Sequence, residues 1–458
     1  MPAGAGGRPP LPPGPHLVLG LARSGQAAAR ALARHGEQVI AVDDGHPSGA
    51  GALADEGIEV HLGGSPETIV HRAQTLVESP GIPHDAPLAA AARTAGLEVI
   101  GELELAWRLL ANPFAVVTGT NGKTTTVQLL GRMLGEAGVP VAVAGNVGTP
   151  LASLVGTLNP GAWVACEASS FQLEDATAFA PDAAILLNLS EDHLDRHGSM
   201  AAYTAAKLQA FVRQGPEALA VLPLGLDSEL GVPGAARRVR FAPVGAPAVE
   251  GVELVDDHGT LRWRGEALIA GDEIALPGLH NRLNAMAAAA AALGLGVPAA
   301  AVRTALREFR GVAHRLETVA QRDGVRWVND SKATNVASTL VALRCFPRHT
   351  VHLIAGGREK GGYAGLRAEV AQRCAAVYLI GEAAPTIDAA LEGVDVPRRS
   401  CGELAVAVTL AAAAARPGDV VLLSPACASY DQFVDFEERG DRFRGLAAAQ
   451  AGPGPRPG

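Results

Sequence analysis

The sequence predicts an α/β protein of three domains, and three observations point to that class. The chain has 458 residues, too many for one ordinary domain of roughly 100 to 200 residues. Apolar stretches, glycine-rich turns and helical stretches alternate along most of its length, as in doubly wound parallel sheets. Aromatic residues make up only 4% of the chain, so alanine, leucine and valine must fill the cores, which suits helices packed on sheets better than an all-β fold.

The first domain is predicted over residues 1–110. Its opening stretch, residues 1–15, is rich in glycine and proline, a composition that predicts a disordered end. The apolar run at 17–20 predicts a strand that leads through a glycine turn into a helix. Further strands are predicted over 38–44 and 75–82, which gives the alternation of a parallel sheet.

The central domain is predicted over residues 111–311. It opens with a strand, a glycine-rich loop and a helix over 114–138. Buried strands are predicted over 162–169 and 182–189, because both are continuous apolar runs of strand length. An alanine-rich helix over 281–296 lies near the end of this domain.

The third domain is predicted over residues 312–458 and repeats the alternation of strands with helical sequence. Its last residues, AGPGPRPG, predict a second disordered end. Three α/β units in one chain make ligand clefts between domains the expected arrangement. The candidate strands of this domain are 326–330, 349–357, 375–381 and 418–426.

Composition and charge exclude several classes of protein. The formal net charge is −9 with no long Lys/Arg run, so no nucleic-acid partner is expected. Five scattered cysteines without C-x-x-C spacing argue against disulfides or a zinc site and fit a reducing compartment. The N-terminus lacks an apolar signal region, and no stretch reaches the roughly 18 apolar residues of a membrane span. We expect a soluble, cytoplasmic monomer with no membrane partner.

The stretch TGTNGKTTT, residues 118–126, stands between a predicted strand and a predicted helix. Glycines let the backbone fold around phosphate oxygens, and the N–H groups of a helix start face the anion. In such a loop Lys123 reaches the β- and γ-phosphates, and the Thr124 hydroxyl ligates Mg²⁺. A strict P-loop has another glycine where Val117 stands, so this loop is a variant. A plain glycine-rich turn with a solvated lysine fits the flanking elements less well, and we predict that the loop binds ATP.

Acidic and imidazole side chains follow two predicted strands of the central domain. Glu167 ends one strand, where α/β sheets place their ligands, and its carboxylate suits a hard cation. Asp192, His193, Asp195 and His197 follow the next strand. A lone histidine is more often structural, but this density at a strand end favours a site. Lys207, taken by itself, is a surface lysine of a helix.

Gly20 and Gly25 follow the first predicted strand, with Asp43 about 20 residues further on. The spacing partly matches G-x-G-x-x-G, but Ala22 replaces the middle glycine. By itself the pattern leaves dinucleotide binding, mononucleotide binding and a plain strand–helix turn open.

Taken together, these segments resemble the Mur ligases, the ATP-driven peptide ligases of peptidoglycan precursor synthesis. The likeness covers nearly the whole chain, and SSFQLE and SPACASYDQF resemble the members that add D-glutamate. The DNPR motif of the members that add diaminopimelate or lysine is absent. The matching motifs are, in order, GLARSG, ESPGI, GTNGKTTT, GNVG, EASSFQLE, NLSEDHLDRHGSM, YTAAK, LPGLHNRLNA, HRLE, NDSKATN, AGGREKGGY and SPACASYDQFVDFEERG.

The resemblance implies a Rossmann-like N-terminal domain for a UDP group, a P-loop-type central ATPase domain and a Rossmann-like C-terminal domain. It implies that the carboxylate of UDP-MurNAc-L-alanine attacks the γ-phosphate of ATP, after which the amine of D-glutamate displaces phosphate. Lys123, His193 and Lys207 would be catalytic. Thr124 and Glu167 would hold one Mg²⁺, and His193 and Lys207 a second. Since an ammonium group cannot ligate Mg²⁺, Lys207 would carry a carbamate formed with CO₂.

The resemblance also assigns binding residues to each of the three substrates. For ATP they would be Gly119, Thr120, Asn121, Gly122, Lys123, Thr124, Thr125, Asn146, Asn281, Asn284, Arg315 and Asp330. For the UDP group they would be Leu21, Ala22, Arg23, Asp43, Ser79 and Gly81, and for D-glutamate Lys332, Thr334, Lys360, Ser429 and Phe436.

Other functions remain open beside this one. The nearest is another ligase of the same superfamily, such as the alanine-adding member or a folylpolyglutamate synthase. The glycines of the first domain alone suggest a nucleotide-binding dehydrogenase, and a non-enzymatic ATP-binding switch is a third class. The ordered set Lys123, Glu167, His193 and Lys207 opposes the last two. Ligand chemistry, rather than fold, distinguishes the first.

Overall fold

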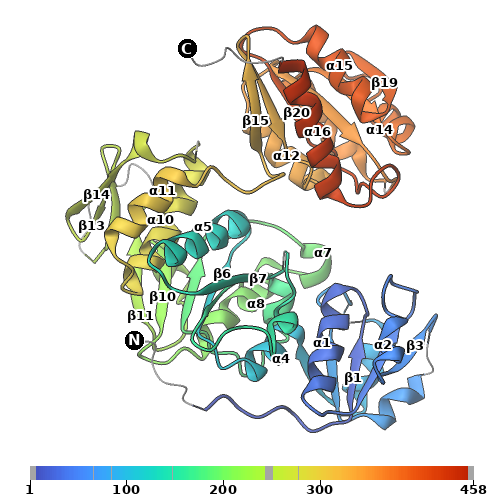
Figure 1. The fold of residues 1–458 in the computed structure, drawn as a ribbon, viewed down its shortest axis with the longest axis vertical. Coiled ribbons are helices and arrows are strands. Elements are labelled where there is room, and N and C mark those ends of the chain that lie inside the picture. Colours follow the sequence, from blue (N-terminus) through green and yellow to red (C-terminus); the bar gives the residue numbers. More distant parts are fainter. Residues whose placement is uncertain are drawn as a thin grey trace. The chain divides into compact units, whose positions relative to one another are not determined.

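The structure of the chain is a computed structural model. It describes residues 7–451 except 65, 66, 84, 147, 243–250, 277 and 360, so most of the predicted C-terminal disordered end lies outside the described residues. The chain divides into two compact units, Met1–Phe309 and Arg310–Gly458 (Figure 1). The first unit contains two β-sheets and the second contains one.

The first sheet has five parallel strands in the order β3-β2-β1-β4-β5. The chain runs from β1 through α1 to β2, and later crosses to β4 on the other side of β1. Sheets of this Rossmann-like order bind ligands beyond the carboxyl ends of the strands at such a switch point. The elements are β1 (His16–Leu19), α1 (Arg23–Arg34), β2 (Val39–Asp43), α2 (Ala52–Asp55), β3 (Glu59–Leu62), η1 (Glu67–Arg72), β4 (Thr75–Glu78), α3 (Pro87–Thr94), β5 (Glu98–Gly101) and α4 (Glu102–Leu109).

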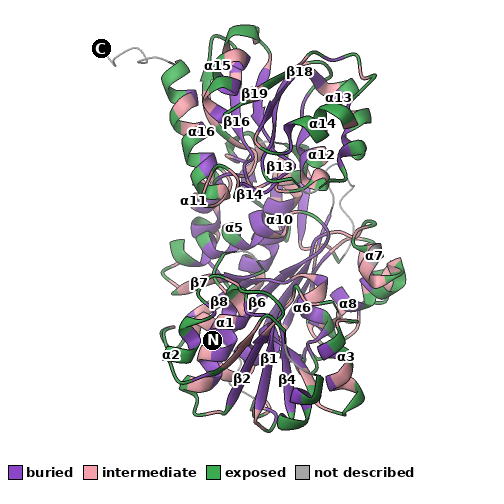
Figure 2. Ribbon diagram, turned by 90° about the vertical axis from the view of Figure 1, so that its right-hand side faces the viewer, coloured by how far each residue is buried: buried purple, intermediate pink, exposed green. Residues whose placement is uncertain are grey.

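The central sheet has nine strands in the order β14-β13-β12-β11-β10-β9-β6-β8-β7. Every residue of β6, which leads into the predicted phosphate loop, is buried, because helices cover this part of the sheet (Figure 2). The elements are β6 (Phe114–Thr118), α5 (Lys123–Glu136), β7 (Val141–Gly145), η2 (Leu151–Leu154), β8 (Trp163–Glu167), α6 (Ser170–Glu174), β9 (Ala183–Leu186), α7 (Leu194–His197), α8 (Met200–Val212), β10 (Leu219–Pro223), α9 (Leu226–Leu230), β11 (Arg237–Phe241), β12 (Leu254–Asp257), β13 (Thr260–Trp263), β14 (Glu266–Ala270), η3 (Gly271–Glu273), α10 (Leu279–Gly294) and α11 (Ala299–Glu308).

Two tight hairpins extend this sheet from β12 to β14, and the sequence analysis did not predict them. Strand β13 runs antiparallel to both of its neighbours, β12 and β14. In the rest of the sheet, from β12 across to β7 in sheet order, all neighbouring strands are parallel. Each connection has two residues with positive φ, His258 at 47° with Gly259 at 88°, and Arg264 at 49° with Gly265 at 87°. These are the backbone angles of type I′ turns, which match the twist of the strands that they join.

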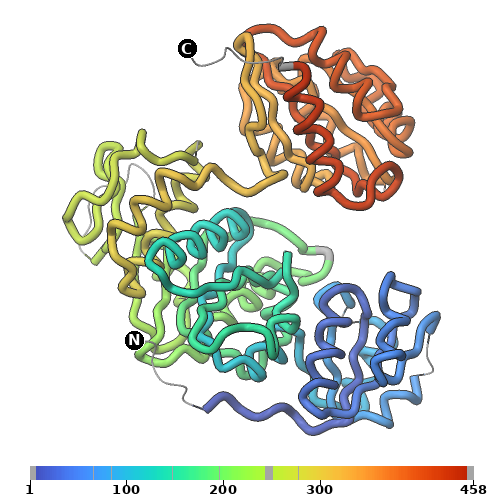
Figure 3. The backbone as a smooth tube through the Cα atoms, in the orientation of Figure 1, coloured from blue at the N-terminus to red at the C-terminus, as the bar shows by residue number. Residues whose placement is uncertain are grey.

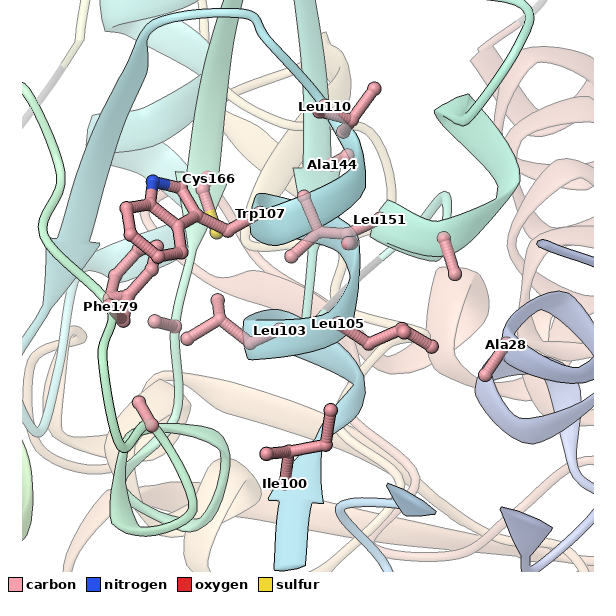
Figure 4. Close-up of a cluster of buried hydrophobic side chains, with 14 of the residues drawn as sticks. Ala28, Ile100, Leu103, Leu105, Trp107, Leu110, Ala144, Leu151, Cys166 and Phe179 are labelled. Carbon is pink, nitrogen blue, oxygen red and sulfur yellow. The ribbon is translucent and has the colours of Figure 1, made fainter. Parts of the chain in front are cut away.

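One hydrophobic core joins the two sheets of the first unit. Helix α4 follows β5 directly and packs against α1 of the first sheet and against elements of the central sheet. Figure 4 shows Leu105 of α4 beside Ala28 of α1, with Trp107 and Phe179 close together on the far side of the helix. The rings of Trp107 and Phe179 meet edge to face with their centres 5.6 Å apart. The first two sheets are therefore parts of one packed body.

Residues 7–15 belong to this body as well, so the prediction of disorder is wrong for them. Figure 3 shows this segment running along the outside of the unit before it enters β1. Arg8 donates to the carbonyl oxygens of Trp107 and Asn112, both at 2.6 Å. Its guanidinium carbon lies 4.9 Å from the centre of the Trp107 ring. A composition rich in glycine and proline did not reveal these contacts, because they depend on residues about 100 positions away.

The second unit contains a sheet in the order β15-β16-β20-β17-β18-β19. Only β15 runs antiparallel to its neighbour, β16. The four strands predicted for this domain are confirmed as β16, β17, β18 and β20, whereas β15 and β19 were not predicted. The elements are β15 (Glu317–Arg322), β16 (Val325–Asn329), α12 (Val336–Arg344), β17 (Val351–Gly356), η4 (Tyr363–Leu366), α13 (Arg367–Arg373), β18 (Cys374–Ile380), α14 (Ala384–Ala390), β19 (Arg398–Gly402), α15 (Leu404–Ala414), β20 (Val420–Leu423) and α16 (Phe436–Ala451).

Three mainly parallel sheets with intervening helices confirm the predicted α/β class. None of the helices in the described part of the chain combines the length and the apolar character that crossing a bilayer requires.

Candidate active site

The predicted phosphate loop connects the buried end of β6 to the first turn of α5. Gly122 precedes the helix at φ +89°, and a Cβ atom there would lie 2.0 Å from Oδ1 of Asn284. Glycine meets both demands because it tolerates positive φ and has no side chain. Asn281 and Asn284, both predicted to bind ATP, lie on α10, with Nδ2 of Asn284 3.4 Å from Oδ1 of Asn281. The structure thus brings Asn284 against the loop, whose helix start at Lys123 favours an anion.

The residues that follow β9 hold this loop in place. The N–H of Thr120 donates to the carbonyl of Asn188 at 2.9 Å, and the N–H of Asn121 donates to the Asn188 side chain at 2.9 Å. The Thr120 hydroxyl lies 3.0 Å from the Tyr203 hydroxyl and accepts from the N–H of Ser190 at 3.0 Å. The loop is therefore preorganised by its neighbours. The sequence analysis missed Asn188, Ser190 and Tyr203 as neighbours of the loop, although all three stand inside motifs that it quoted.

Two lysines meet at the phosphate loop. Lys123 donates to the carbonyls of Gly119 and Thr120 at 2.9 and 2.8 Å, and Lys207, from α8, donates to the same Gly119 oxygen at 2.9 Å. Lys207 is 1% exposed, with its ammonium nitrogen 4.4 Å from the centre of the Tyr203 ring. Burial, together with the charge of Lys123, lowers the pKa of Lys207 to about 7. It is therefore not the surface lysine that its helix alone suggested.

Glu167 ends β8 beside the loop and is almost fully buried. Its Oε2 accepts from the Thr124 hydroxyl at 2.7 Å, and its Oε1 accepts from the Asn146 amide at 3.2 Å. A hydroxyl and a carboxylate next to a phosphate loop are the oxygen ligands that Mg²⁺ prefers beside phosphates. Thr124 and Glu167 lie close enough together to hold one Mg²⁺, and the role that the resemblance implies for this pair stays a prediction.

The two histidines of the DHLDRH segment have different surroundings. The His197 side chain is 1% exposed, with Nε2 3.0 Å from the Ser170 hydroxyl, and burial lowers its pKa. Its ring stacks on Phe171 with the centres 5.3 Å apart. The His193 side chain is 48% exposed, and its Nε2 lies 3.5 Å from Oδ2 of Asp192. His197 is thus a packed residue, whereas His193 is accessible to a ligand.

Protein side chains by themselves do not form a second cation site here. In the part of the chain that the structure describes, no group of three or more His, Cys, Asp or Glu residues is arranged to hold a metal ion. A second Mg²⁺ near His193 would therefore need further oxygen ligands from a substrate phosphate or from a modified side chain.

A cavity of about 280 Å³ lies beyond the carboxyl ends of β1, β2 and β4. Asp43 shapes one wall, because its carboxylate accepts from the N–H groups of Leu21 at 2.6 Å and Gly45 at 2.8 Å. The Ser79 hydroxyl donates to the Gly20 carbonyl at 2.7 Å. The cavity is lined by Gly20, Ala22, Ser24, Asp43, Ser79, Pro80, Gly81, Ile82, Asn146 and Gln172.

Four of the six residues predicted for the UDP group line this cavity, namely Ala22, Asp43, Ser79 and Gly81. The other two do not. Leu21 has its side chain in the core, and Arg23 donates to the Gly148 carbonyl at 2.7 Å. Gln172 and Asn146 line the cavity without having been predicted there. Because Asn146 also bonds to Glu167, it connects the cavity to the phosphate loop.

Most of the predicted residues of the second unit come after the adjacent strands β16 and β20. Arg315 instead precedes β15, and its N–H donates to the Val312 carbonyl at 3.2 Å. Asp330 is 5% exposed, and its carboxylate accepts from the N–H of Leu316 at 3.1 Å and the Ser424 hydroxyl at 2.8 Å. Burial raises the pKa of Asp330 to about 7, although these bonds and the charge of Arg315 act in the opposite direction. Asp330 is therefore fixed in orientation by both of its oxygens.

The residues predicted for D-glutamate come from three segments of this unit. The Lys332 ammonium lies 5.9 Å from the centre of the Phe436 ring. The N–H of Thr334 donates to the Lys332 carbonyl at 2.9 Å, and Ser429 is 2% exposed. Lys360 lies outside the described residues. The structure therefore brings Lys332 close to Phe436, with Thr334 two positions after Lys332 in the same segment.

Family models for the Mur ligases match three successive parts of the chain. The model of the MurD-like N-terminal domain matches residues 15–101, the Mur ligase middle domain matches 117–292, and the glutamate ligase domain matches 314–427. The chain belongs to the Mur ligase family.

Curated relatives resemble this Mur ligase over nearly its full length. A UDP-N-acetylmuramoylalanine–D-glutamate ligase from Anaeromyxobacter dehalogenans is 46% identical and spans 95% of this chain and 97% of its own. A ligase with the same name from Acidobacterium capsulatum is 43% identical over 95% of this chain and 96% of its own.

Solved structures show that this Mur ligase shares the fold of its family. The UDP-N-acetylmuramate–alanine ligase MurC from Thermotoga maritima is 19% identical with a TM-score of 0.56, covering 95% of this chain and 99% of that one. The MurF ligase from Thermotoga maritima, determined in complex with ADP, is 17% identical with a TM-score of 0.55, covering 95% and 94%.

All four lysines of this Mur ligase are residues that the sequence analysis assigned to the site. They are Lys123, Lys207, Lys332 and Lys360. Elsewhere the chain uses arginine as its cation. Arginine stays charged at any ordinary pH, whereas a lysine can lose its proton and act as an amine. Amine chemistry of side chains is therefore confined to the predicted site.

Proposed function

We propose that this Mur ligase joins D-glutamate to UDP-N-acetylmuramoyl-L-alanine at the expense of ATP, as a step of peptidoglycan precursor synthesis. The observation that carries the proposal is the match to ligases named for D-glutamate addition, at 46% identity over 95% of this chain. The phosphate loop, with Thr124 and Glu167 beside it, supplies the phosphoryl-transfer chemistry that such a ligase needs. The reaction takes place in the cytoplasm, on a monomeric enzyme.

ATP binds with its β- and γ-phosphates on the loop of residues 119–125. Lys123 exchanges its carbonyl partners on the loop for phosphate oxygens, which are better acceptors because they are charged. Thr124 and Glu167 would hold Mg²⁺, which would supply positive charge beside the phosphoryl oxygens. The hydrogen bond of 2.7 Å between Thr124 and Glu167 supports this assignment, since it already places the two ligands together.

The reaction consists of two substitutions. The alanine carboxylate of the UDP substrate attacks the γ-phosphorus, ADP leaves, and an acyl phosphate forms. The amine of D-glutamate then attacks the acyl carbon and loses a proton, and inorganic phosphate departs as the amide bond forms. Negative charge concentrates on the phosphoryl oxygens in the first step, where Lys123 provides the opposite charge.

A carbamate on Lys207 is part of the proposal. With its pKa lowered to about 7, the side chain has a large neutral fraction at neutral pH, and a neutral amine adds CO₂ with loss of a proton. The carbamate oxygens and the accessible His193 would hold a second Mg²⁺, and the carbamate would supply oxygen ligands that the unmodified side chains lack.

The cavity of the first sheet takes the uridine diphosphate group. Its volume of about 280 Å³ suits a mononucleotide better than a dinucleotide. The start of α1 points its first N–H groups at the end of this sheet, where a pyrophosphate is favoured. Asn146 lines the cavity and bonds to Glu167, which supports a path from the nucleotide to the phosphate loop for the reacting end of the substrate.

The proposed ATP ligands of the second unit are Arg315 and Asp330. D-Glutamate binds through Lys332, Thr334, Lys360, Ser429 and Phe436. The cations and hydroxyls among them suit an amino acid with two carboxylates.

The deciding experiment measures phosphate release from ATP by the purified full-length protein with Mg²⁺ and UDP-MurNAc-L-alanine. The acceptor is varied among D-glutamate, L-glutamate, L-alanine, glycine and diaminopimelate. We expect turnover when D-glutamate is the acceptor and none with the other four acceptors. We also expect no turnover when the UDP substrate is left out. Equal turnover with L-alanine, or turnover without the UDP substrate, would overturn the proposal.

A further inference from the structure

Arg439 is a fully buried arginine of α16, the dark red helix of Figure 1. Its Nε donates to the Ser331 hydroxyl at 2.9 Å, and its Nη2 donates to the Ser331 carbonyl at 2.9 Å. Nη2 also donates to the Cys427 carbonyl at 3.1 Å, and Nη1 donates to the Ala428 carbonyl at 3.3 Å. One guanidinium group thus ties two loops of the second unit to one helix.

The two loops carry residues proposed to bind substrates. Ser331 stands between Asp330 and Lys332, and Ala428 directly precedes Ser429. The carbonyl of Ala428 also accepts from the N–H of Arg358 at 2.9 Å, which attaches a third segment to the same point.

The fit between these segments is close. A Cβ atom on Gly357 would lie 2.2 Å from the Ala428 carbonyl and 3.1 Å from Nη1 of Arg439. The Ser331 hydroxyl donates to the Phe436 carbonyl at 2.8 Å, which fixes the start of α16 to the same loop. Each segment that supplies a proposed D-glutamate residue therefore either bonds to Arg439 or bonds to a residue that Arg439 holds.

The bonds of Arg439 also set the direction of the peptide groups around it. In a trans peptide the carbonyl and the following N–H point in opposite directions. Because the Cys427 and Ala428 carbonyls point at the guanidinium group, the N–H groups of Ala428 and Ser429 point away from it. Removal of the guanidinium group takes this donor from the Cys427 carbonyl and leaves the Ala428 carbonyl with the N–H of Arg358, so the peptides that lead to Ser429 are held less firmly.

The charge of Arg439 is not neutralised locally. No carboxylate within the described part of the chain comes within 4.0 Å of its nitrogen atoms, and the charge of Asp431 acts on it from further away. Burial lowers the pKa of Arg439 to about 10, so the group stays charged at neutral pH. A buried cation surrounded only by neutral acceptors attracts an incoming anion.

We propose that Arg439 is a positioning residue for D-glutamate, which orients the loops of Ser331 and Ser429 and adds a positive charge behind them. The inference rests on the proposed function and extends it to a residue that does not touch the substrate. It predicts that loss of Arg439 weakens the binding of D-glutamate but not the binding of ATP or of the UDP substrate.

The test compares Arg439→Ala and Arg439→Lys with Arg442→Ala in the full-length protein. Arg442 is exposed on the same helix, three positions further on, so it controls for the loss of an arginine from α16. We expect the KM for D-glutamate to rise about tenfold or more in both Arg439 variants, with the KM values for ATP and the UDP substrate unchanged within about twofold. Added ethylguanidine should restore part of the D-glutamate affinity in Arg439→Ala, and Arg442→Ala should match the parent protein.

An unchanged KM for D-glutamate, or a parallel rise of all three KM values, would overturn the inference. Should Arg439→Ala fail to fold, Arg439→Lys carries the test, because it keeps the charge but cannot make the same set of bonds. Hydrogen exchange of the intact protein gives an independent measurement. The amides of residues 331–334 and 427–430 should exchange faster in either Arg439 variant than in the parent protein, while β17 keeps its protection. Exchange in these two loops at the rate of the parent protein would contradict the positioning role of Arg439. If the parent protein shows no D-glutamate-dependent turnover, the proposed function is refuted. The hydrogen-exchange result would still test whether Arg439 orients the two loops, because it does not depend on turnover.

Discussion

The ammonium groups of Lys123 and Lys207 donate to one carbonyl oxygen, that of Gly119, each at 2.9 Å. Lys123 comes from the first turn of α5 and Lys207 from the interior of α8. Burial of Lys207 disfavours its charged form, and the nearby charge of Lys123 acts in the same direction. The pKa of Lys207 is therefore lowered to about 7.

Lys207→Ala should reduce turnover at least about 100-fold, because it removes the amine that forms the carbamate and a partner of the phosphate loop. Phosphate release in the complete assay measures this loss. The parent protein should also lose activity in buffer freed of CO₂ and regain it on addition of bicarbonate. Formation of the carbamate should increase as the pH rises through about 7, since only the neutral amine adds CO₂.

Carbon-13 NMR with labelled bicarbonate can assign the carbamate, because only four lysine side chains are present. The signal should disappear in Lys207→Ala and persist in Lys332→Ala, which serves as the control for the spectrum. A Lys207→Ala enzyme with a normal rate would contradict the carbamate and the catalytic role together.

Glu167→Gln should raise the Mg²⁺ concentration needed for half-maximal activity and lower the maximal rate about 100-fold. The amide keeps the shape of the side chain but removes the charge that attracts the cation. Two variants of Thr124, the partner of Glu167, separate the effect of side-chain shape from the effect of the hydroxyl group. Thr124→Ser keeps the hydroxyl that donates to Glu167 at 2.7 Å and should retain most of the activity, whereas Thr124→Val keeps the shape and should lose it. Unaltered Mg²⁺ dependence in Glu167→Gln would rule out this cation site.

The phosphate loop could be predicted because its signal is local. Strand, glycines, Lys123 and helix are contiguous, so the pattern of a few residues defines the site. Glu167 could be predicted for a related reason, since it ends an apolar run and strand ends gather at one edge of a parallel sheet. The hairpin turns at Gly259 and Gly265 also had a local signal, an X-Gly pair between short strands, which the sequence analysis overlooked.

Other parts of the site could not be predicted from the pattern of residues, because they depend on contacts between distant segments. Arg439 and Arg442 stand one turn apart on α16, and the sequence around them does not tell which one is buried. Only the folded unit shows that Arg439 meets Ser331, 108 positions earlier. The role of Asn188 in holding the phosphate loop could not be predicted either, since it depends on the hydrogen bond from the Thr120 N–H.

Glu102→Gln should change how the stability of the protein depends on pH. Glu102 is fully buried at the start of α4, accepts from the Ala152 N–H at 2.7 Å, and burial raises its pKa to about 7. Between the ordinary value of 4.5 and about 7, the folded protein holds a proton that the unfolded chain releases. The stability that this protonated group contributes is complete below the ordinary value and is lost as the pH rises through about 7.

The neutral glutamine does not titrate, so Glu102→Gln should gain stability relative to the parent protein between pH 5 and pH 8, by about 1 to 3 kcal/mol. Urea unfolding at several pH values measures the difference. Glu67→Gln, at an exposed position, is the control and should show no such trend. A constant difference between Glu102→Gln and the parent across this range would show that Glu102 does not titrate there.

Gly25→Ala and Gly135→Ala should change stability in opposite directions, although both glycines lie in helices. A Cβ atom on Gly25 would lie 1.8 Å from the Gly20 carbonyl, so α1 would have to move away from β1. We expect a loss of about 3 kcal/mol or more, together with a higher KM for the UDP substrate. Gly135 has no atom within 4 Å of the added Cβ, and alanine there should add about 0.5 to 1 kcal/mol. Thermal and urea unfolding measure both, and a tolerated Gly25→Ala would contradict the close approach of helix and strand.

Arg8→Ala should destabilise the first unit, although Arg8 belongs to a segment whose composition predicted disorder. The change removes donors to the Trp107 and Asn112 carbonyls, both at 2.6 Å, and the contact with the Trp107 ring. Charged hydrogen bonds of this kind contribute about 1.5 to 3 kcal/mol, so the urea midpoint should fall visibly. Arg8→Lys discriminates between charge and geometry, because an ammonium keeps the charge but lacks the planar fork that reaches two carbonyls. It should recover only part of the loss. An Arg8→Ala protein as stable as its parent would mean that the segment lies on the surface without holding the linker between α4 and β6.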